Sequence, residues 1–507
     1  MSRLIRTLLP LAALAAALAP AAQAQKSADT LRVAWRDQIV DIDPYYNNLR
    51  TGLVVAHQAW DTLVYRDPDG FVMKPALATS WKWVDDVTLE FELRRGVKFH
   101  NGDPVTAADV VYTVGIITDP KSGISVPSNF VWLAGAEAID EYHVRLKLKQ
   151  AFPAAIEFIS FVMPIYPKAY REKVGKDAYS KAPIGAGPYR ITRVDGGNEI
   201  DLERFADYYA DSPKGRPPIG RLVIKQVTDS STELAMLMGG QVDWIWQFNP
   251  DQFDKIGAMP NLTTLRQEAM RVAHLAIDGG GRSGEKNPLT DVRVRRAIWH
   301  AIDRETFARQ LVQGGSRVPD APCYFTQFGC DMAAAVHYDY DPAKARALLT
   351  EAGYPNGFDT ELVSPLLPQW AGAIQNYLGA VGIRAKVNVL QATAAVQRVE
   401  KGDVPLYLSS WGSYSINDVS AIIPYFFNGG PDDMARDAEV TRLVKEGGSV
   451  TDPEQRKKSY SAAIHRITDQ AEWLPIATYV TTYAINKQLN FKAFPDELPR
   501  YFLASWK

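Results

Sequence analysis

The seven histidines are the side chains in this sequence best suited to acid–base catalysis or metal binding. They stand singly, at positions 57, 100, 143, 274, 300, 337 and 465, and no two have the spacing that would place both on one helix face. The sequence contains no H-E-x-x-H zinc motif and no G-x-S-x-G nucleophile motif. It therefore predicts a protein that is not an enzyme, with a secreted hydrolase as the less favoured alternative.

A glycine-rich stretch, GGGRSG at residues 279–284, matches the G-x-G-x-x-G pattern of dinucleotide-binding sites. In such sites a helix begins at the turn, and its N-terminus holds the pyrophosphate. Here Asn287 and Pro288 come before any helix. We interpret the stretch as a surface loop and expect no nucleotide or other cofactor.

The two cysteines, Cys323 and Cys330, enclose the short segment YFTQFG. Two cysteines alone are too few ligands for a structural zinc site. In an oxidising compartment so close a pair favours a disulfide, and two unpaired buried thiols are the alternative.

Residues 1–24 have the features of a secretory signal peptide. Arg3 and Arg6 precede an apolar run at 8–18, and Ala22 and Ala24 form a small-residue cleavage site before Gln25. No cysteine follows the cleavage site to carry a lipid, and no later segment has the ~18 apolar residues of a spanning helix. We therefore expect a soluble protein in the periplasm of a Gram-negative bacterium.

The bulk composition limits the architecture and the partners. The 507 residues are too many for one hydrophobic core, so two or three domains are expected. Lysine and arginine number 56 against 58 acidic residues, which gives no basic footprint for nucleic acid.

The pattern of apolar residues predicts an α/β fold. Residues 80–114 indicate a strand pair, turned at Asp85 and Asp86, followed by a helix that Thr106 and Asp109 begin. Further on, strands at 360–363, 383–389 and 405–410 alternate with helices at 369–380 and 393–401, which favours a parallel sheet. One long helix is expected over residues 291–313.

Several motifs resemble those of the family 5 extracellular solute-binding proteins, the peptide/nickel-type receptors of ABC importers. They are LRRGVKFHNG at 93–102, PVTAADV at 104–110, GAGPY at 185–189, GQVD at 240–243, VRRAIWHAIDRE at 294–305 and DPAKA at 341–345. The resemblance implies a type II periplasmic-binding-protein-like fold with two hinged lobes. It places the first lobe at 25–60, 184–272 and 477–507, an inserted small domain at 61–183, and the second lobe at 273–476.

The resemblance also implies a role in transport. A monomer would capture a small solute between the lobes and deliver it to the permease subunits of an importer in the inner membrane. A nickel or metal-chelate receptor of the same family is the alternative, in which His274 is a candidate for contact with the chelate.

The ligand-contacting residues that the resemblance implies lie in loops that face the cleft between the lobes. The main loop is SSWGSYSIND at 409–418. The candidates are Ser410, Trp411, Gly412, Ser413, Tyr414 and Asp418 of this loop, Tyr45, Asn47 and Asn48 after the first strand, and Trp246, Phe248 and Trp370.

Two anchors for a free dipeptide are missing from the family pattern. Tyr414 stands where dipeptide-type members carry an aspartate for the peptide ammonium, and residues 364–370 contain no arginine for the carboxylate. A buried charge needs such a partner. Asp418 is a possible substitute for the acid, although a helix N-cap is its favoured role. With its many aromatic side chains, the site predicts a sugar, an aromatic acid or a modified peptide rather than a simple dipeptide.

Overall fold

The computed structural model describes residues 29–37, 41–47 and 49–507. The predicted signal peptide and the candidate Asn48 lie outside these ranges. Within them, no helix has both the length and the hydropathy that crossing a bilayer requires.

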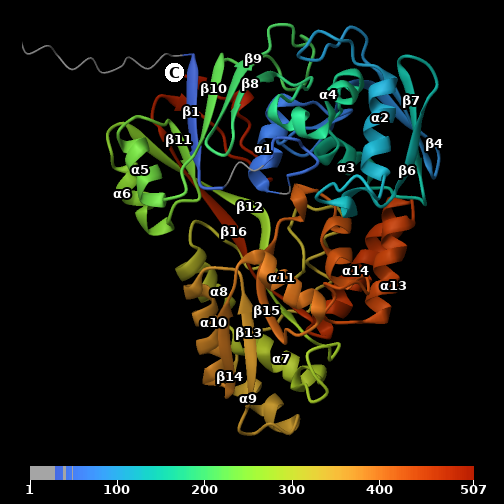
Figure 1. Ribbon diagram of the computed structural model, residues 1–507. Coiled ribbons are helices and arrows are strands. Elements are labelled where there is room, and N and C mark those ends of the chain that lie inside the picture. The colour runs from blue at the N-terminus through green and yellow to red at the C-terminus, as the bar shows by residue number, and fades with distance from the viewer. Residues whose placement is uncertain (1–28, 38–40, 48) are drawn as a thin grey trace, which may run out of the picture.

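One ten-stranded sheet runs through the whole molecule (Figure 1). Its order is β14-β13-β15-β12-β16-β11-β1-β10-β9-β8. The strands are β1 (Thr30–Trp35), β8 (Tyr189–Asp195), β9 (Glu199–Arg204), β10 (Arg221–Gln226), β11 (Trp244–Trp246), β12 (Leu262–Ile277), β13 (Phe358–Ser364), β14 (Ile383–Val389), β15 (Leu406–Trp411) and β16 (Trp473–Asn486).

Strands β12 and β16 connect two lobes. The first half of β12 pairs with the end of β16 beside β11, and its second half pairs with the start of β16 and with β15. The ladder shifts register between Glu268 and Val272, between these two halves. We call the part around β1 and β8–β11 the first lobe and the part around β13–β15 the second lobe (Figure 1).

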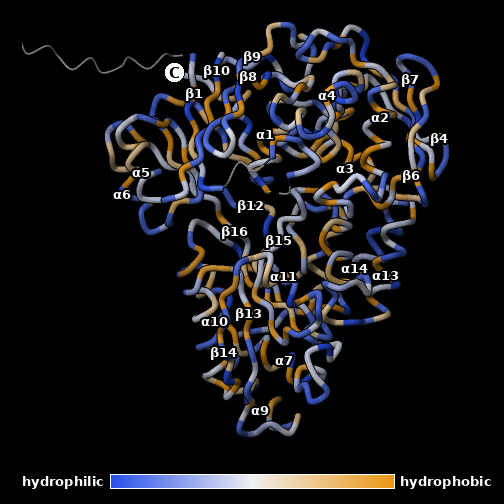
Figure 2. The backbone as a smooth tube through the Cα atoms, viewed as in Figure 1, coloured by the Kyte–Doolittle hydropathy of each residue, from blue (hydrophilic) through white to orange (hydrophobic). Residues whose placement is uncertain are grey.

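The second lobe has the predicted alternation of strands and helices. Strand β13 runs parallel to both β14 and β15, and the connecting helices are α10 (Pro368–Ala380) and α11 (Ala392–Lys401). Alternate residues of β15 enter two different hydrophobic clusters: Leu406 and Leu408 pack on one face of the sheet, and Tyr407 on the other. Helices therefore cover both faces, as a largely parallel sheet requires. Figure 2 shows hydrophobic segments in both lobes.

The expected long helix over 291–313 is wrong, because the chain breaks it near its middle. Helix α7 (Val292–Ala301) ends at Ile302, whose backbone is extended. The carboxylate of Asp303 then accepts a hydrogen bond from the Thr306 N–H at 2.8 Å and caps α8 (Arg304–Phe307). A local N-cap thus outweighs the continuous apolar pattern.

Residues 61–183 contain a separate four-stranded sheet in the order β4-β5-β7-β6. Its strands are β4 (Ala78–Asp85), β5 (Thr88–Leu93), β6 (Leu133–Ala138) and β7 (His143–Leu148). Helix α2 (Ala107–Thr118) begins as predicted, with the Thr106 N–H donating to the Asp109 carboxylate at 2.8 Å. Phe91 of β5 and Leu202 of β9 belong to one hydrophobic cluster, so this sheet packs on the first lobe. The domain boundaries themselves stay a prediction.

The remaining helices lie outside this central arrangement. They are α1 (Arg50–Ala59), α3 (Ala155–Val162), α4 (Lys168–Lys181), α5 (Ser230–Met238), α6 (Phe253–Gly257), α9 (Pro342–Glu351), α12 (Ile423–Phe427), α13 (Ala438–Ser449) and α14 (Pro453–Asp469). Helix α1 begins directly after a first-lobe loop that faces the second lobe (Figure 1).

Candidate functional site

A cavity of about 450 Å³ lies between the two lobes. The first lobe contributes residues from 44–53, and the segment 61–183 contributes residues from 124–130. The second lobe contributes residues from α11, from β15 and the loop after it, and from 425–434. This volume lies in the range of pockets that hold small organic ligands. A solute in this cavity would contact both lobes.

Six of the predicted contact residues line this cavity: Tyr45, Asn47, Ser410, Trp411, Gly412 and Tyr414. The Trp411 ring stacks on Tyr425, with centroids 4.3 Å apart, and meets the edge of Tyr414 at 5.1 Å. The Tyr45 hydroxyl donates to the Pro164 carbonyl at 2.6 Å, so this ring is fixed before any ligand arrives. Direct contact of these residues with a solute stays a prediction.

Three predicted aromatic residues lie away from the cavity wall. Trp246 is buried among Trp35 and Tyr483 in the first-lobe core, because both faces of β11 are covered. Phe248 is buried against the ring of Phe253, and Trp370 is buried against the ring of Phe307. Large aromatic side chains serve cores as readily as clefts, and the sequence does not distinguish the two uses.

The loop residues Ser413 and Asp418 are also buried away from the cavity. The Asp418 carboxylate accepts a hydrogen bond from the Ser420 N–H at 2.9 Å and pairs with Arg456 at 2.9 Å. The N-cap role is therefore the one the structure shows, and the carboxylate already has a cationic partner.

Residues 413–415 adopt an unusual backbone conformation. Ser413, Tyr414 and Ser415 have φ angles of 51°, 47° and 62°, in the left-handed region. Each such residue costs of order 1–3 kcal/mol and persists only where surrounding contacts hold it. Two arginines from outside the second lobe supply those contacts: Arg66 donates to the Ser415 carbonyl and Arg50 to the Ser415 hydroxyl, both at 2.6 Å.

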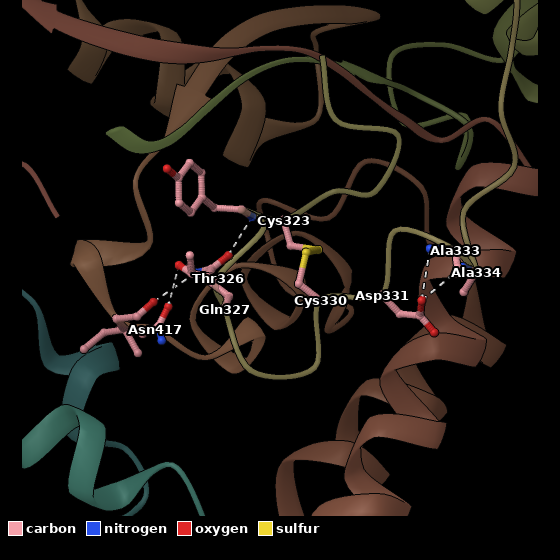
Figure 3. Close-up of a disulfide and its surroundings, with 10 residues drawn as sticks. Cys323, Thr326, Gln327, Cys330, Asp331, Ala333, Ala334 and Asn417 are labelled. Atoms are coloured by element: carbon pink, nitrogen blue, oxygen red, sulfur yellow. Dashed lines mark hydrogen bonds between the residues drawn. A yellow bond between two sulfur atoms is a disulfide. The ribbon is translucent and has the colours of Figure 1, made fainter. Parts of the chain in front are cut away.

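A disulfide supports the same loop from the second lobe. Cys323 and Cys330 are joined, with their Cα atoms 5.8 Å apart (Figure 3). Within the loop they close, Gln327 donates to the Ile416 carbonyl and Thr326 to the Asn417 side chain, both at 2.9 Å (Figure 3). The disulfide loop therefore fixes the segment that directly follows the left-handed residues.

Removing this disulfide is expected to destabilise the protein by about 2–3 kcal/mol, because the cross-link restricts the unfolded chain. The test is urea unfolding of the Cys323→Ser, Cys330→Ser double variant against the wild type. Reductant should lower wild-type stability to the level of the variant and leave the variant unchanged. Equal unfolding free energies of the oxidised wild type and the variant would contradict the expectation.

Two cavity residues that the sequence did not reveal are arginines. Arg50 is the first residue of α1, and Arg271 lies at the register shift of β12, where the chain crosses between the lobes. Such an irregularity can redirect a side chain out of the sheet ladder. A charged residue inside the apolar segment AMRVAHLAI was the one available signal for Arg271.

Asp432 is the one acidic residue among the described residues of the cavity wall. Burial raises the pKa of Asp432, and the charge of Glu400 adds to this, while a hydrogen bond from Tyr425 opposes it. Burial likewise raises the pKa of Tyr414, so its phenol stays neutral and able to donate a hydrogen bond. The wall thus combines aromatic rings with an acid and two arginines.

Comparison with known proteins identifies the family. A sequence profile of the bacterial extracellular solute-binding proteins, family 5, matches residues 72–433. The chain belongs to this family. Family 5 proteins are substrate-binding proteins of ABC importers, and the relatives of this chain are binding proteins rather than enzymes.

The relatives of this family 5 protein differ in the solutes for which they are named. Heme-binding protein A of Haemophilus influenzae is 28% identical over 461 residues, which cover 83% of this chain and 82% of that protein. The glutathione-binding protein GsiB of Escherichia coli is 27% identical over 509 residues, 96% of each. The structure of HbpA2 from Haemophilus parasuis has a TM-score of 0.80 at 24% identity and covers 94% of this chain and 100% of that one. The last comparison confirms the predicted two-lobed α/β fold.

Proposed function

We propose that this protein captures a small organic solute in the cavity between its lobes and delivers it to the permease of an ABC importer. It acts in the periplasm, as a monomer and without catalysing a reaction. The observation that carries the proposal is that both lobes line one cavity. A solute that contacts both lobes binds the closed state better than the open state, and so closes the protein.

The solute is not an unmodified dipeptide bound through end-anchors at the usual family positions. Asp418 is already paired with Arg456. The loop that carries the carboxylate anchor in dipeptide-type members contributes Pro365 and Leu366 to the cavity, both apolar. The relatives named for heme and for glutathione make both compounds essential members of a test panel.

Binding of a solute is expected to raise the thermal stability of the mature protein. A ligand at a hundred times its dissociation constant adds about 2.7 kcal/mol. The panel contains di- and tripeptides, glutathione, hemin, sugars, opines, aromatic acids and nickel–histidine, each measured by thermal unfolding. Failure of every solute class to shift the unfolding temperature would contradict the proposal, and a shift by nickel–histidine alone would favour the metal-chelate alternative.

Trp411→Ala is expected to weaken binding of the solute at least tenfold, or about 1.4 kcal/mol, because the stacked ring forms part of the cavity wall. Trp83→Ala is the matched control, since Trp83 lies in the separate sheet with 39% of its surface exposed. Titration calorimetry with the compound found above provides the measurement. Equal affinities of the two variants would remove Trp411 from the site.

The candidate residue for the metal-chelate alternative lies outside the described cavity wall. His274, the candidate for contact with a metal chelate, is fully buried and stacks on Trp473 at 4.0 Å. Burial lowers the pKa of His274 to about 3. Over the described ranges, no three histidine, cysteine or acidic side chains cluster as a metal site would require.

A further inference from the structure

The two cavity arginines belong to a buried ionic cluster at the junction of the lobes. Its ion pairs join Arg66 to Glu157 and Asp496, Arg500 to Asp496, and both Arg50 and Arg271 to Glu497. Ser415 connects the two groups, because it accepts hydrogen bonds from both Arg50 and Arg66. The cluster holds four guanidinium groups against three carboxylates and so has one positive charge in excess.

The excess positive charge lies on the side of the cluster that faces the cavity. Arg50 and Arg271 line the cavity, whereas Glu497 behind them is only 4% exposed. Glu497 pairs closely with Arg271, whose Nη2 is 3.1 Å from the carboxylate, and more loosely with Arg50, at 3.6 Å. The carboxylate therefore balances one guanidinium group and leaves the charge of the other to the cavity.

The two guanidinium groups converge at Gly412. A Cβ atom built on Gly412 would lie 3.3 Å from Nη2 of Arg50 and 3.4 Å from Nη2 of Arg271. Because Gly412 has no side chain, this position beside both groups is accessible from the cavity. Trp411, which directly precedes Gly412, also lines the cavity. The ring centroids of Trp411 and Tyr414 are 5.1 Å apart.

We infer that Arg50 and Arg271, brought together at Gly412, form a carboxylate subsite, so that the solute is an organic acid with an aromatic or apolar body. This inference rests on the proposed function. Guanidinium groups bind carboxylates through paired, charge-assisted hydrogen bonds. The carboxylate would neutralise the excess charge of the cluster, and the body of the acid would lie against Trp411 and Tyr414. The arginine absent from residues 364–370 is thus replaced by two arginines from other elements.

Matched pairs of acid and amide test this inference: indole-3-acetate with indole-3-acetamide, phenylacetate with phenylacetamide, and N-acetyltryptophan with its amide. Ligand-observed NMR and thermal unfolding detect dissociation constants up to roughly 1 mM. We expect each acid that binds to do so at least tenfold more tightly than its amide. Equal binding of acids and amides, or no binding of any acid, overturns the inference.

The inference predicts that two substitutions change the affinity for the acids in opposite directions. Arg50→Gln removes the excess charge and leaves the Arg271–Glu497 pair in place, so acids should bind at least tenfold more weakly. Glu497→Gln adds to the excess charge, so acids should bind more tightly, a gain that misfolding does not produce. Arg190→Gln, with half of its side chain exposed, is the control and should change nothing.

The outcomes separate this inference from the proposed function. A neutral solute whose binding Trp411→Ala abolishes and Arg50→Gln leaves unchanged would overturn the carboxylate subsite and leave the solute receptor standing. Failure of every class in both panels to bind would overturn both. Tighter binding of acids to the Glu497→Gln variant and weaker binding to the Arg50→Gln variant would establish the subsite.

Discussion

Asp496→Asn is expected to lower the free energy of unfolding by about 3–5 kcal/mol, the cost of removing one partner from a buried ion pair. Asp496 is fully buried and pairs with Arg500 at 2.7 Å and with Arg66 at 3.3 Å. The substitution leaves both guanidinium groups with less compensation in a site that water does not reach. Arg66 also holds the strained Ser415 backbone, so solute affinity should fall as well.

The loss of unfolding free energy caused by Asp496→Asn should become smaller as the pH falls. Burial alone would raise the pKa of Asp496, but Arg500 and Arg66 outweigh it and hold the pKa below the usual range. The stability that Asp496 contributes is therefore present above the unfolded pKa of about 3.9 and is lost as the pH falls towards the folded value. Urea unfolding of the variant and the wild type at pH 7, 5 and 3 should give a difference that shrinks with acidification.

Asp69→Asn is the matched control for this experiment. Asp69 pairs with Lys492 at 2.6 Å, but both side chains are more than half exposed. An exposed pair contributes within about 1 kcal/mol. If Asp496→Asn costs no more than this control, the cluster does not stabilise the junction of the lobes.

Local patterns in the sequence predicted the strands and helices of the second lobe, whereas the two-lobed arrangement was inferred from the resemblance to the family. The alternation of strands and helices after residue 358 matches β13, α10, β14, α11 and β15. The helix cap formed by Thr106 and Asp109 is another local feature, because the two residues are three apart in the sequence and the start of the helix brings them together. Such features need no knowledge of distant contacts, so they can be inferred before the structure is known.

The candidate site was only partly predictable, because its charges come from distant parts of the chain. Arg50 and Arg271 both pair with Glu497. More than two hundred residues separate Arg50 from Arg271, and more than two hundred separate Arg271 from Glu497, so no local sequence pattern links the three. Trp411 and Tyr414 were accessible to prediction because the resemblance to the family implies that the loop at 409–418 faces the cleft. Trp246 and Trp370 were also predicted to contact the ligand, but both side chains are packed in the protein core.

Glu472→Gln is expected to stabilise the protein at neutral pH. Glu472 is buried just before β16, and burial raises the pKa of Glu472 to about 8, with the charge of Asp437 adding to this and Arg295 opposing it. Between the unfolded pKa near 4.3 and pH 8, the unfolded chain releases this proton and the folded chain keeps it. Wild-type stability therefore falls as the pH rises through this window, by up to about 1.4 kcal/mol per pH unit.

Glutamine keeps the shape and the hydrogen-bond donor of the protonated acid but does not titrate, so its advantage over glutamate should grow with pH. We expect almost no difference at pH 4.5 and roughly 3 kcal/mol at pH 7, measured by urea unfolding. Asp437 stays an acceptor throughout, because its carboxylate pairs with Arg466 at 2.7 Å and caps α13. Glu439→Gln, on the exposed face of the same helix, should show no such growth with pH. A difference between Glu472→Gln and the wild type that is constant from pH 4.5 to 8 would mean that Glu472 is ionised in the folded protein, with Arg295 as its counter-ion.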